Sequence, residues 1–196
     1  MFLVLIIHFV SGIFYAIDTY KGKVKPNKVS FGLWALAPFI GAAATLSKGF
    51  TWSVFPVIIA GLNPLMVFIA SFFNKKSYWK LGKLDYFCLV LSLFAIILWI
   101  ITRNSLYAVI FSVLADLFAS IPTLIKIYRF PQTERPYLFI VGGLSSLFGL
   151  SLVNTWGLNE CLFPIYLITI NILLVFGFYF NELMLFYDKR KKNNNS

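Results

Sequence analysis

Seven apolar segments alternate with short polar connections along this chain, and each is long enough to cross a lipid bilayer. Crossing the hydrocarbon core takes roughly 17–25 helical residues. The segments lie near residues 2–20, 31–47, 52–73, 84–102, 105–127, 137–156 and 162–186. Hydrophobic residues make up 60% of the 196 residues and charged residues only 12%, whereas about a quarter of a soluble domain is charged. The pattern predicts an all-α integral membrane protein with seven transmembrane helices.

The basic residues collect on alternate connections, and this sets the expected orientation. Of the 17 Lys and Arg residues, all but Lys48 and Arg103 follow the first, third, fifth or seventh segment. They are Lys21, Lys23, Lys25, Lys28, Lys75, Lys76, Lys80, Lys83, Lys126, Arg129, Arg135, Lys189, Arg190, Lys191 and Lys192. Because cytoplasmic loops carry the excess of Lys and Arg, the N-terminus is predicted outside and the C-terminus inside. The formal charge of +10 then reflects topology, and no nucleic acid is expected as a partner.

The chain divides into two similar halves around a connector. Residues 1–73 hold the first three segments, 74–104 a basic loop and the connector helix, 105–187 the last three segments, and 188–196 a basic polar tail expected to be disordered. At an offset of 104 residues, the sequence AIDT at 16–19 falls on SIPT at 120–123. At an offset of 108, Asn63 falls on Asn171. Because the odd connector restores the chain direction, the repeats are expected to be parallel.

A polar stripe runs along the fifth segment. Ser112, Asp116, Ser120 and Thr123 recur at helical spacing and so share one face. A lone carboxylate in an apolar helix normally faces a bundle interior or a wet cavity. Asp116 is therefore expected to bind a coupling proton, to accept a hydrogen bond from a solute, or to pair internally. His8, on the equivalent face of the first segment, is either a packed residue or a second member of a proton relay.

Two asparagines lie inside apolar helices at corresponding positions of the halves. Asn63 precedes Pro64, and a proline within a helix frees the carbonyl four residues earlier. An amide beside a freed carbonyl forms a polar solute site. The alternative is that Asn63 bonds that carbonyl or a neighbouring helix. Asn171 in the second half favours a pocket lined from both halves.

The architecture resembles the PQ-loop superfamily, which includes the SWEET sugar transporters. The matching positions are Asp18-Thr19 and Pro122-Thr123, each at a helix end before a basic turn. The resemblance implies a carrier in which Asn63 and Asn171 line a central pocket. It also implies hinges at prolines, for which Pro122 and Pro38 are candidates. We add Pro64 as a third pivot.

Trp34 near the start of the second segment belongs either to an interfacial aromatic belt or to a stacking platform for a solute. The sequence has one His, two separated cysteines, no phosphate loop and no nucleophile–histidine pair, so no metal, no cofactor and no enzymatic activity are expected.

The expected function is carriage of a small polar solute by alternating access of two triple-helix bundles. The alternative is a heptahelical receptor or interaction protein that binds a ligand without transporting it. The expected partners are the solute and the lipid bilayer, and a homo-oligomer stays open. The abundance of Lys, Asn, Ile and Phe favours an AT-rich bacterium, and hence its plasma membrane.

Overall fold

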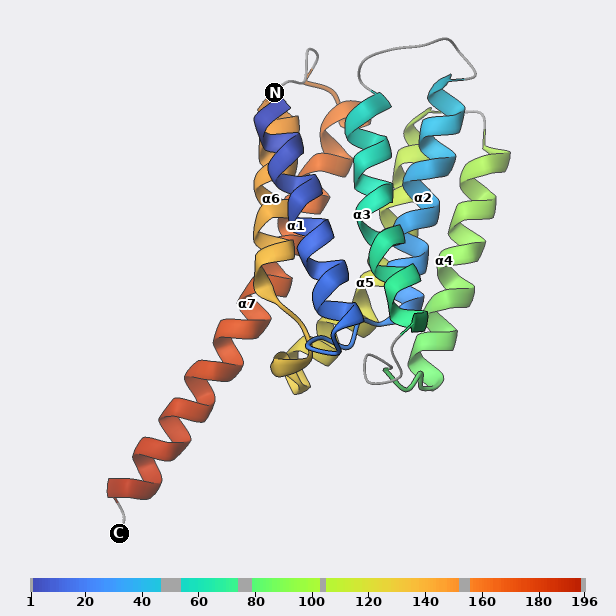
Figure 1. Cartoon of the computed structure of the whole chain (residues 1–196). Coiled ribbons are helices and arrows are strands. Elements are labelled where there is room, and N and C mark those ends of the chain that lie inside the picture. The colour runs from blue at the N-terminus through green and yellow to red at the C-terminus, as the bar shows by residue number, and fades with distance from the viewer. Residues whose placement is uncertain (1, 47–53, 74–78, 103–104, 152–155, 195–196) are drawn as a thin grey trace.

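The computed structural model describes residues 2–46, 54–73, 79–102, 105–151 and 156–194, and the statements below concern these residues. Within them the chain forms seven α-helices and one short 3-10 helix, with no β-strand. The elements are α1 (Phe2–Tyr20), α2 (Lys28–Leu46), α3 (Val54–Phe73), α4 (Lys83–Ile101), α5 (Ser105–Arg129), η2 (Pro131–Thr133), α6 (Pro136–Ser151) and α7 (Leu158–Asn194). Each predicted segment corresponds to one α-helix, which confirms the expected all-α fold (Figure 1).

Three helices are long and apolar enough to cross a membrane. These stretches are Leu3–Tyr20 in α1, Val109–Arg129 in α5 and Cys161–Phe180 in α7. The apolar stretches Ile58–Phe73 of α3 and Pro136–Ser151 of α6 are shorter. Length and composition thus support membrane insertion for at least part of the bundle.

Several helix boundaries differ by a few residues from those predicted, and those of α2 and α7 have a physical explanation. α2 begins at Lys28, because the side-chain oxygen of Asn27 accepts hydrogen bonds from the backbone N–H groups of Val29 (3.0 Å) and Ser30 (3.4 Å) and so caps the helix. α7 continues to Asn194 and so includes most of the basic tail that begins at residue 188. Lys and Arg have good helix propensity, and their positive charge interacts favourably with a helix C-terminus.

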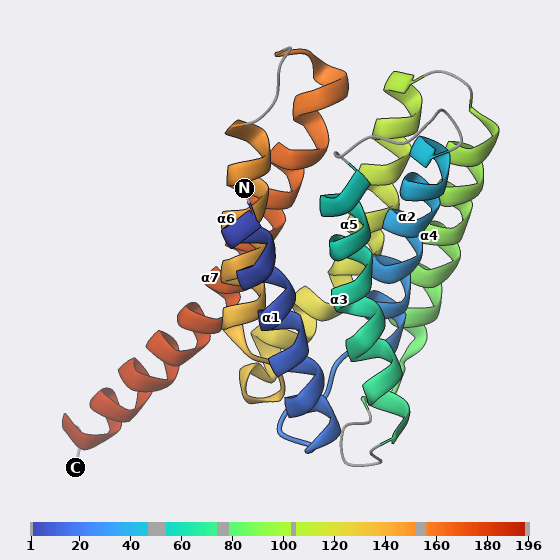
Figure 2. The same ribbon diagram turned by 45° about the horizontal axis from the view of Figure 1, so that its top comes forward.

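Direct contacts link α1, α2 and α3 to one another through α3, and α5, α6 and α7 through α7, and we refer to these two sets as the two groups. α3 contacts both α1 and α2, and α7 contacts both α5 and α6. Across the groups, α1 contacts α6 and α2 contacts α5, while α4 packs mainly on α5 (Figure 2). α1, α3 and α5 finish, and α2, α4 and α6 begin, at the lower end of Figure 1, which we call the basic end. α7 extends past this end, away from the other helices.

The apolar core has three clusters of buried side chains, and one residue contacts all three. The first cluster contains residues of α2, α4 and α5. The second contains residues of α1, α2, α3 and α6, and the third contains residues of α5, α6 and α7. The indole of Trp34 in α2 packs against each cluster. Its ring makes edge contacts with Phe31, at a centroid distance of 5.1 Å, and with Phe139 of α6, at 6.3 Å. Trp34 therefore joins the two groups of helices.

Replacing Trp34 by alanine should strongly destabilise the fold. Truncation of a packed Trp costs about 3–5 kcal/mol, because a cavity replaces its contacts. Trp156 is the matched control, since 76% of its surface is exposed and little packing is lost in Trp156→Ala. The midpoint of thermal unfolding in detergent should fall for Trp34→Ala and stay near the parent value for Trp156→Ala. Equal shifts would contradict the central role of Trp34.

Candidate functional site

A carboxylate, a phenol and a hydroxyl meet between α5 and α7. The Tyr166 hydroxyl donates a 2.7 Å hydrogen bond to Oδ2 of Asp116. Ser120, one turn further along α5, lies 3.3 Å from the same oxygen and donates a 2.8 Å bond to the Asp116 backbone carbonyl. Its hydroxyl is also 3.5 Å from that of Tyr166. The predicted polar stripe thus faces α7 at this level, and Asp116 pairs internally through Tyr166.

Asn63 packs against α1. Its amide nitrogen donates a 2.9 Å bond to the backbone carbonyl of His8, whereas its Oδ1 is buried without a hydrogen-bond partner. The side chain lies on the backbone of Gly12, where an added Cβ would approach Oδ1 to 2.3 Å. This is a hydrogen bond to a neighbouring helix, which the sequence analysis gave as the alternative to a solute site at Asn63. It also leaves one buried acceptor free.

Asn171 lies between α7 and α6. Its amide nitrogen donates a 2.8 Å bond to the carbonyl of Leu167 in its own helix. Its oxygen would lie 3.1 Å from a Cβ at Gly142, and its own Cβ would lie 3.3 Å from one at Gly143. Each asparagine is thus cradled by glycine on a neighbouring helix. No hydrogen bond between these described residues joins Asn63, Asn171 and Asp116 to one another.

The candidate hinge prolines all lie inside helices. Pro38 is in α2, Pro64 in α3 and Pro122 in α5, and each helix continues beyond its proline. α5 therefore extends past the predicted break to Arg129. In Figures 1 and 2 the last turns of α5 lean toward the lower end of α6.

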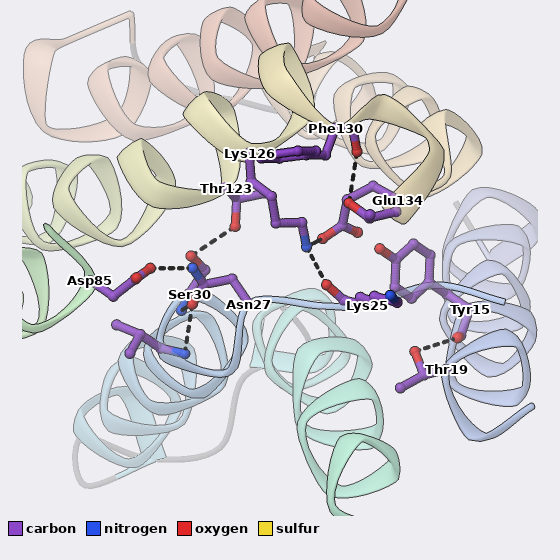
Figure 3. A network of polar contacts seen from close by, with 12 residues as sticks. Tyr15, Thr19, Lys25, Asn27, Ser30, Asp85, Thr123, Lys126, Phe130 and Glu134 are labelled. Atoms are coloured by element: carbon purple, nitrogen blue, oxygen red, sulfur yellow. Dashed lines mark hydrogen bonds and ion pairs between the residues drawn. The ribbon is translucent and has the colours of Figure 1, made fainter. Parts of the chain in front are cut away.

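A second polar network closes the basic end, and the sequence did not predict it (Figure 3). Lys126, counted above among the loop residues, is 2% exposed and donates hydrogen bonds to the carboxylate of Glu134 and the backbone carbonyl of Lys25. Its ammonium also lies 5.0 Å from the centre of the Trp79 ring. The backbone N–H of Lys25 donates a 2.7 Å bond to the carbonyl of Thr133. These bonds join the connection between α1 and α2, the connection between α5 and α6, and the end of α5.

A neighbouring group of bonds ties α2 to α4 and α5. The amide of Asn27, which caps α2, donates to Oδ1 of Asp85 at 2.5 Å, and Asp85 accepts a further bond from the N–H of Gly82. Thr123 of α5 donates a 2.8 Å bond to the hydroxyl of Ser30. All but Gly82 are buried. The network thereby reaches α4 as well as both three-helix groups.

Electrostatics at the Lys126–Glu134 pair combine two opposing effects. Burial raises the pKa of the Glu134 carboxyl, because its charged form loses hydration. The adjacent ammonium favours the charged form. One sequence signal points to this pair, since the chain has only 7 acidic residues and Glu134 lies in a basic connection eight residues after Lys126.

Two further features bear on ligand binding. A groove of about 490 Å³ on the surface is lined by Ile6, Ile7, Val10, Ser11, Phe14, Asp18 and Tyr137, and thus by none of the predicted solute-binding residues. Among the described residues, no three His, Cys, Asp or Glu side chains are grouped so that they could hold a metal ion.

The chain matches no model of a protein family, no curated protein and no solved structure.

Filling the space at Gly12 should destabilise the contact between α1 and α3. An added Cβ meets the Asn63 side chain, and overpacking of this kind costs about 1–3 kcal/mol. Gly149→Ala is the control, because an added Cβ there meets nothing within 4 Å. Thermal unfolding should show a loss for Gly12→Ala only. In the double variant Gly12→Ala/Asn63→Ala, stability should partly return, and an additive loss would contradict the close approach.

Proposed function

We propose that this chain is a membrane carrier or facilitator of a small polar solute, either sugar-like or another metabolite. It works by alternating access of two triple-helix bundles, α1–α3 and α5–α7, with α4 as the connector. The observation that carries the proposal is the reciprocal packing of the two groups. The third helix of each group lies against the other two, and the first helix of each contacts the second helix of the other. Two parallel repeats related by an axis along the membrane normal pack in this way.

In the proposed orientation all seven helices cross the membrane, with the N-terminus outside and the basic end inside. An exposed apolar stripe on α4 supports lipid contact. It consists of Phe87, Val90, Phe94, Ile97 and Ile101, each 51–69% exposed. Spacings of three and four residues place them on one helix face, and an exposed apolar face of this extent marks a membrane or protein contact. The membrane proposed is a bacterial plasma membrane.

The proposed solute site uses polar groups within the apolar spans. Asp116, supported by Tyr166 and Ser120, supplies a carboxylate, and Asn63 supplies a buried oxygen that lacks a protein partner. Buried polar atoms are rarely left without a hydrogen bond, so a free acceptor supports a site for a donor group. Asn171 contributes from the second half.

Trp34 provides an aromatic face between the two bundles. Pro38, Pro64 and Pro122 serve as pivots, since each removes a backbone hydrogen bond within its helix. Asp116 is the proposed proton-binding residue, and His8 the second member of the relay. The resemblance to the PQ-loop superfamily implies the pocket roles of Asn63 and Asn171 and the hinge roles of Pro38 and Pro122.

Transport should depend on Asn171, and an uptake assay distinguishes a carrier from a receptor. Sugars, amino acids, nucleosides and vitamins are first screened for thermal stabilisation of the purified protein, because a ligand of the folded state raises its stability. Vesicle uptake of the stabilising compound should weaken about tenfold in apparent affinity in Asn171→Ala, through loss of a hydrogen bond. Thr169→Ala is the control, because the exposed Thr169 hydroxyl bonds within its own helix. Stabilisation without uptake would favour the receptor.

Proton coupling is tested at Asp116. In Asp116→Asn, accumulation driven by a pH gradient should be lost, while downhill exchange of the same solute continues. The conservative amide keeps an oxygen for Tyr166 but cannot exchange a proton at this pH range. Loss of both activities, or of neither, would remove the proton role.

The proposed topology is tested with C-terminal fusions in a bacterial host. Green fluorescent protein fused after the last residue should fluoresce, and alkaline phosphatase at the same place should be inactive, since both report a cytoplasmic C-terminus. The reverse pair of results would place the basic end outside.

A further inference from the structure

The network at the basic end joins the parts of the protein that a carrier must separate. Lys126 belongs to the second bundle, and the Lys25 carbonyl that it contacts lies between α1 and α2 of the first. The Thr123–Ser30 bond, of 2.8 Å, likewise runs from α5 to α2. The Lys25–Thr133 backbone bond, of 2.7 Å, makes a third connection between the halves. Every one of these bonds must break before the bundles can part at this end.

The buried ion pair of Lys126 and Glu134 suits a contact that must form and break repeatedly. Burying an ammonium and a carboxylate costs hydration free energy that their attraction offsets only in good geometry. Well-packed apolar side chains would join the same segments at least as stably. An ion pair has a second favourable state, because both charges regain water when the contact opens. The pair therefore holds a closed state without making it permanent.

Two buried oxygens in the network are not satisfied by the protein. Oε2 of Glu134 and the hydroxyl of Tyr15 have no hydrogen-bond partner, although these residues are only 2% and 0% exposed. Figure 3 shows the Tyr15 hydroxyl pointing toward the Glu134 carboxylate. Leaving these polar atoms without partners destabilises the closed state. Water that enters on opening forms hydrogen bonds with them and removes this destabilisation.

Pro122 is placed to move the α5 side of the network as one unit. Thr123 and Lys126 both follow it, within about one turn of helix. A helix that bends at a proline displaces the residues beyond it together. Bending at Pro122 would thus withdraw the Ser30 and Lys25 contacts in a single motion.

We propose that the Lys126–Glu134 pair, with its contacts to Lys25 and the adjoining Thr123–Ser30 bond, is the latch of a gate. The gate closes the basic end between the two bundles, and the structure is the state closed at that end. The proposal rests on the proposed carrier function, but its test requires no solute.

The test measures how fast a buried thiol reacts with iodoacetamide, a small neutral reagent. Cys88 and Cys161 are replaced by alanine, and Val24→Cys introduces one thiol at a position that is 0% exposed and adjacent to Lys25. In this background Glu134→Gln and Lys126→Met should each speed alkylation at least about tenfold. Lys23→Met is the matched control, because it removes only the partly exposed Lys23–Asp18 ion pair and should leave the rate unchanged. Unchanged rates in both latch variants would overturn the proposal.

A second reporter distinguishes gate opening from general loosening. Cys161, 8% exposed near the start of α7 and at the other end of the bundle, is kept as the single thiol. Its alkylation should not accelerate in Glu134→Gln, and equal acceleration at both ends would overturn the latch. If Glu134→Gln fails to fold, Glu134→Asp retains the charge but shortens its reach. It should speed alkylation of Val24→Cys severalfold, and no change would count against the proposal.

The outcomes separate this inference from the carrier function. Faster alkylation at the basic end with no transported solute would support a gate and remove the carrier. Uptake that persists with unchanged alkylation in the latch variants would keep the carrier and remove the latch.

Discussion

The arrangement of the basic end depends on satisfying one buried ammonium. Lys126 lies on an apolar helix with almost no exposed surface, so its charge requires partners within the protein. It obtains them from Glu134 after the 3-10 helix and from the backbone of Lys25 between α1 and α2. These partners come from segments about a hundred residues apart in sequence. Satisfying a single charge therefore brings the two halves of the chain together at this end.

The same requirement acts in the interior, where Asp116, Asn63 and Asn171 each have a hydrogen-bond partner within the protein. Asp116 is bonded by Tyr166 and Ser120, and the two asparagines donate to backbone carbonyls. Glycines 12, 142 and 143 allow the close helix approach that these amides need. Among the described residues, four buried side-chain atoms lack a hydrogen-bond partner, namely Tyr15 Oη, Asn63 Oδ1, Glu134 Oε2 and Ser145 Oγ, and the two hydroxyls are donors as well as acceptors.

The apolar pattern of the sequence predicts the helices well and the candidate site only in part. Apolar length and period identify helices directly, so α1 through α7 were all expected. The period also placed Asp116 and Ser120 on one face, but it could not separate them from Thr123, which instead bonds Ser30 on α2. The network of Lys126 and Glu134 was missed because Lys126 was read as a loop charge that signals orientation. Charge counting measures where basic residues occur, not whether their ends reach water.

The number of helices, their approximate ends and the alternation of basic connections can all be predicted from the sequence alone. These follow from the local hydrophobic pattern, which acts within each segment. Three-dimensional packing, in contrast, establishes which helices touch, that Trp34 contacts all three core clusters, and that Asn63 faces Gly12. Contacts of this kind depend on helix rotation and close packing between distant segments. The physical reason is that a hydrophobic pattern specifies which face is apolar, whereas the few buried polar groups specify which partner that face must meet.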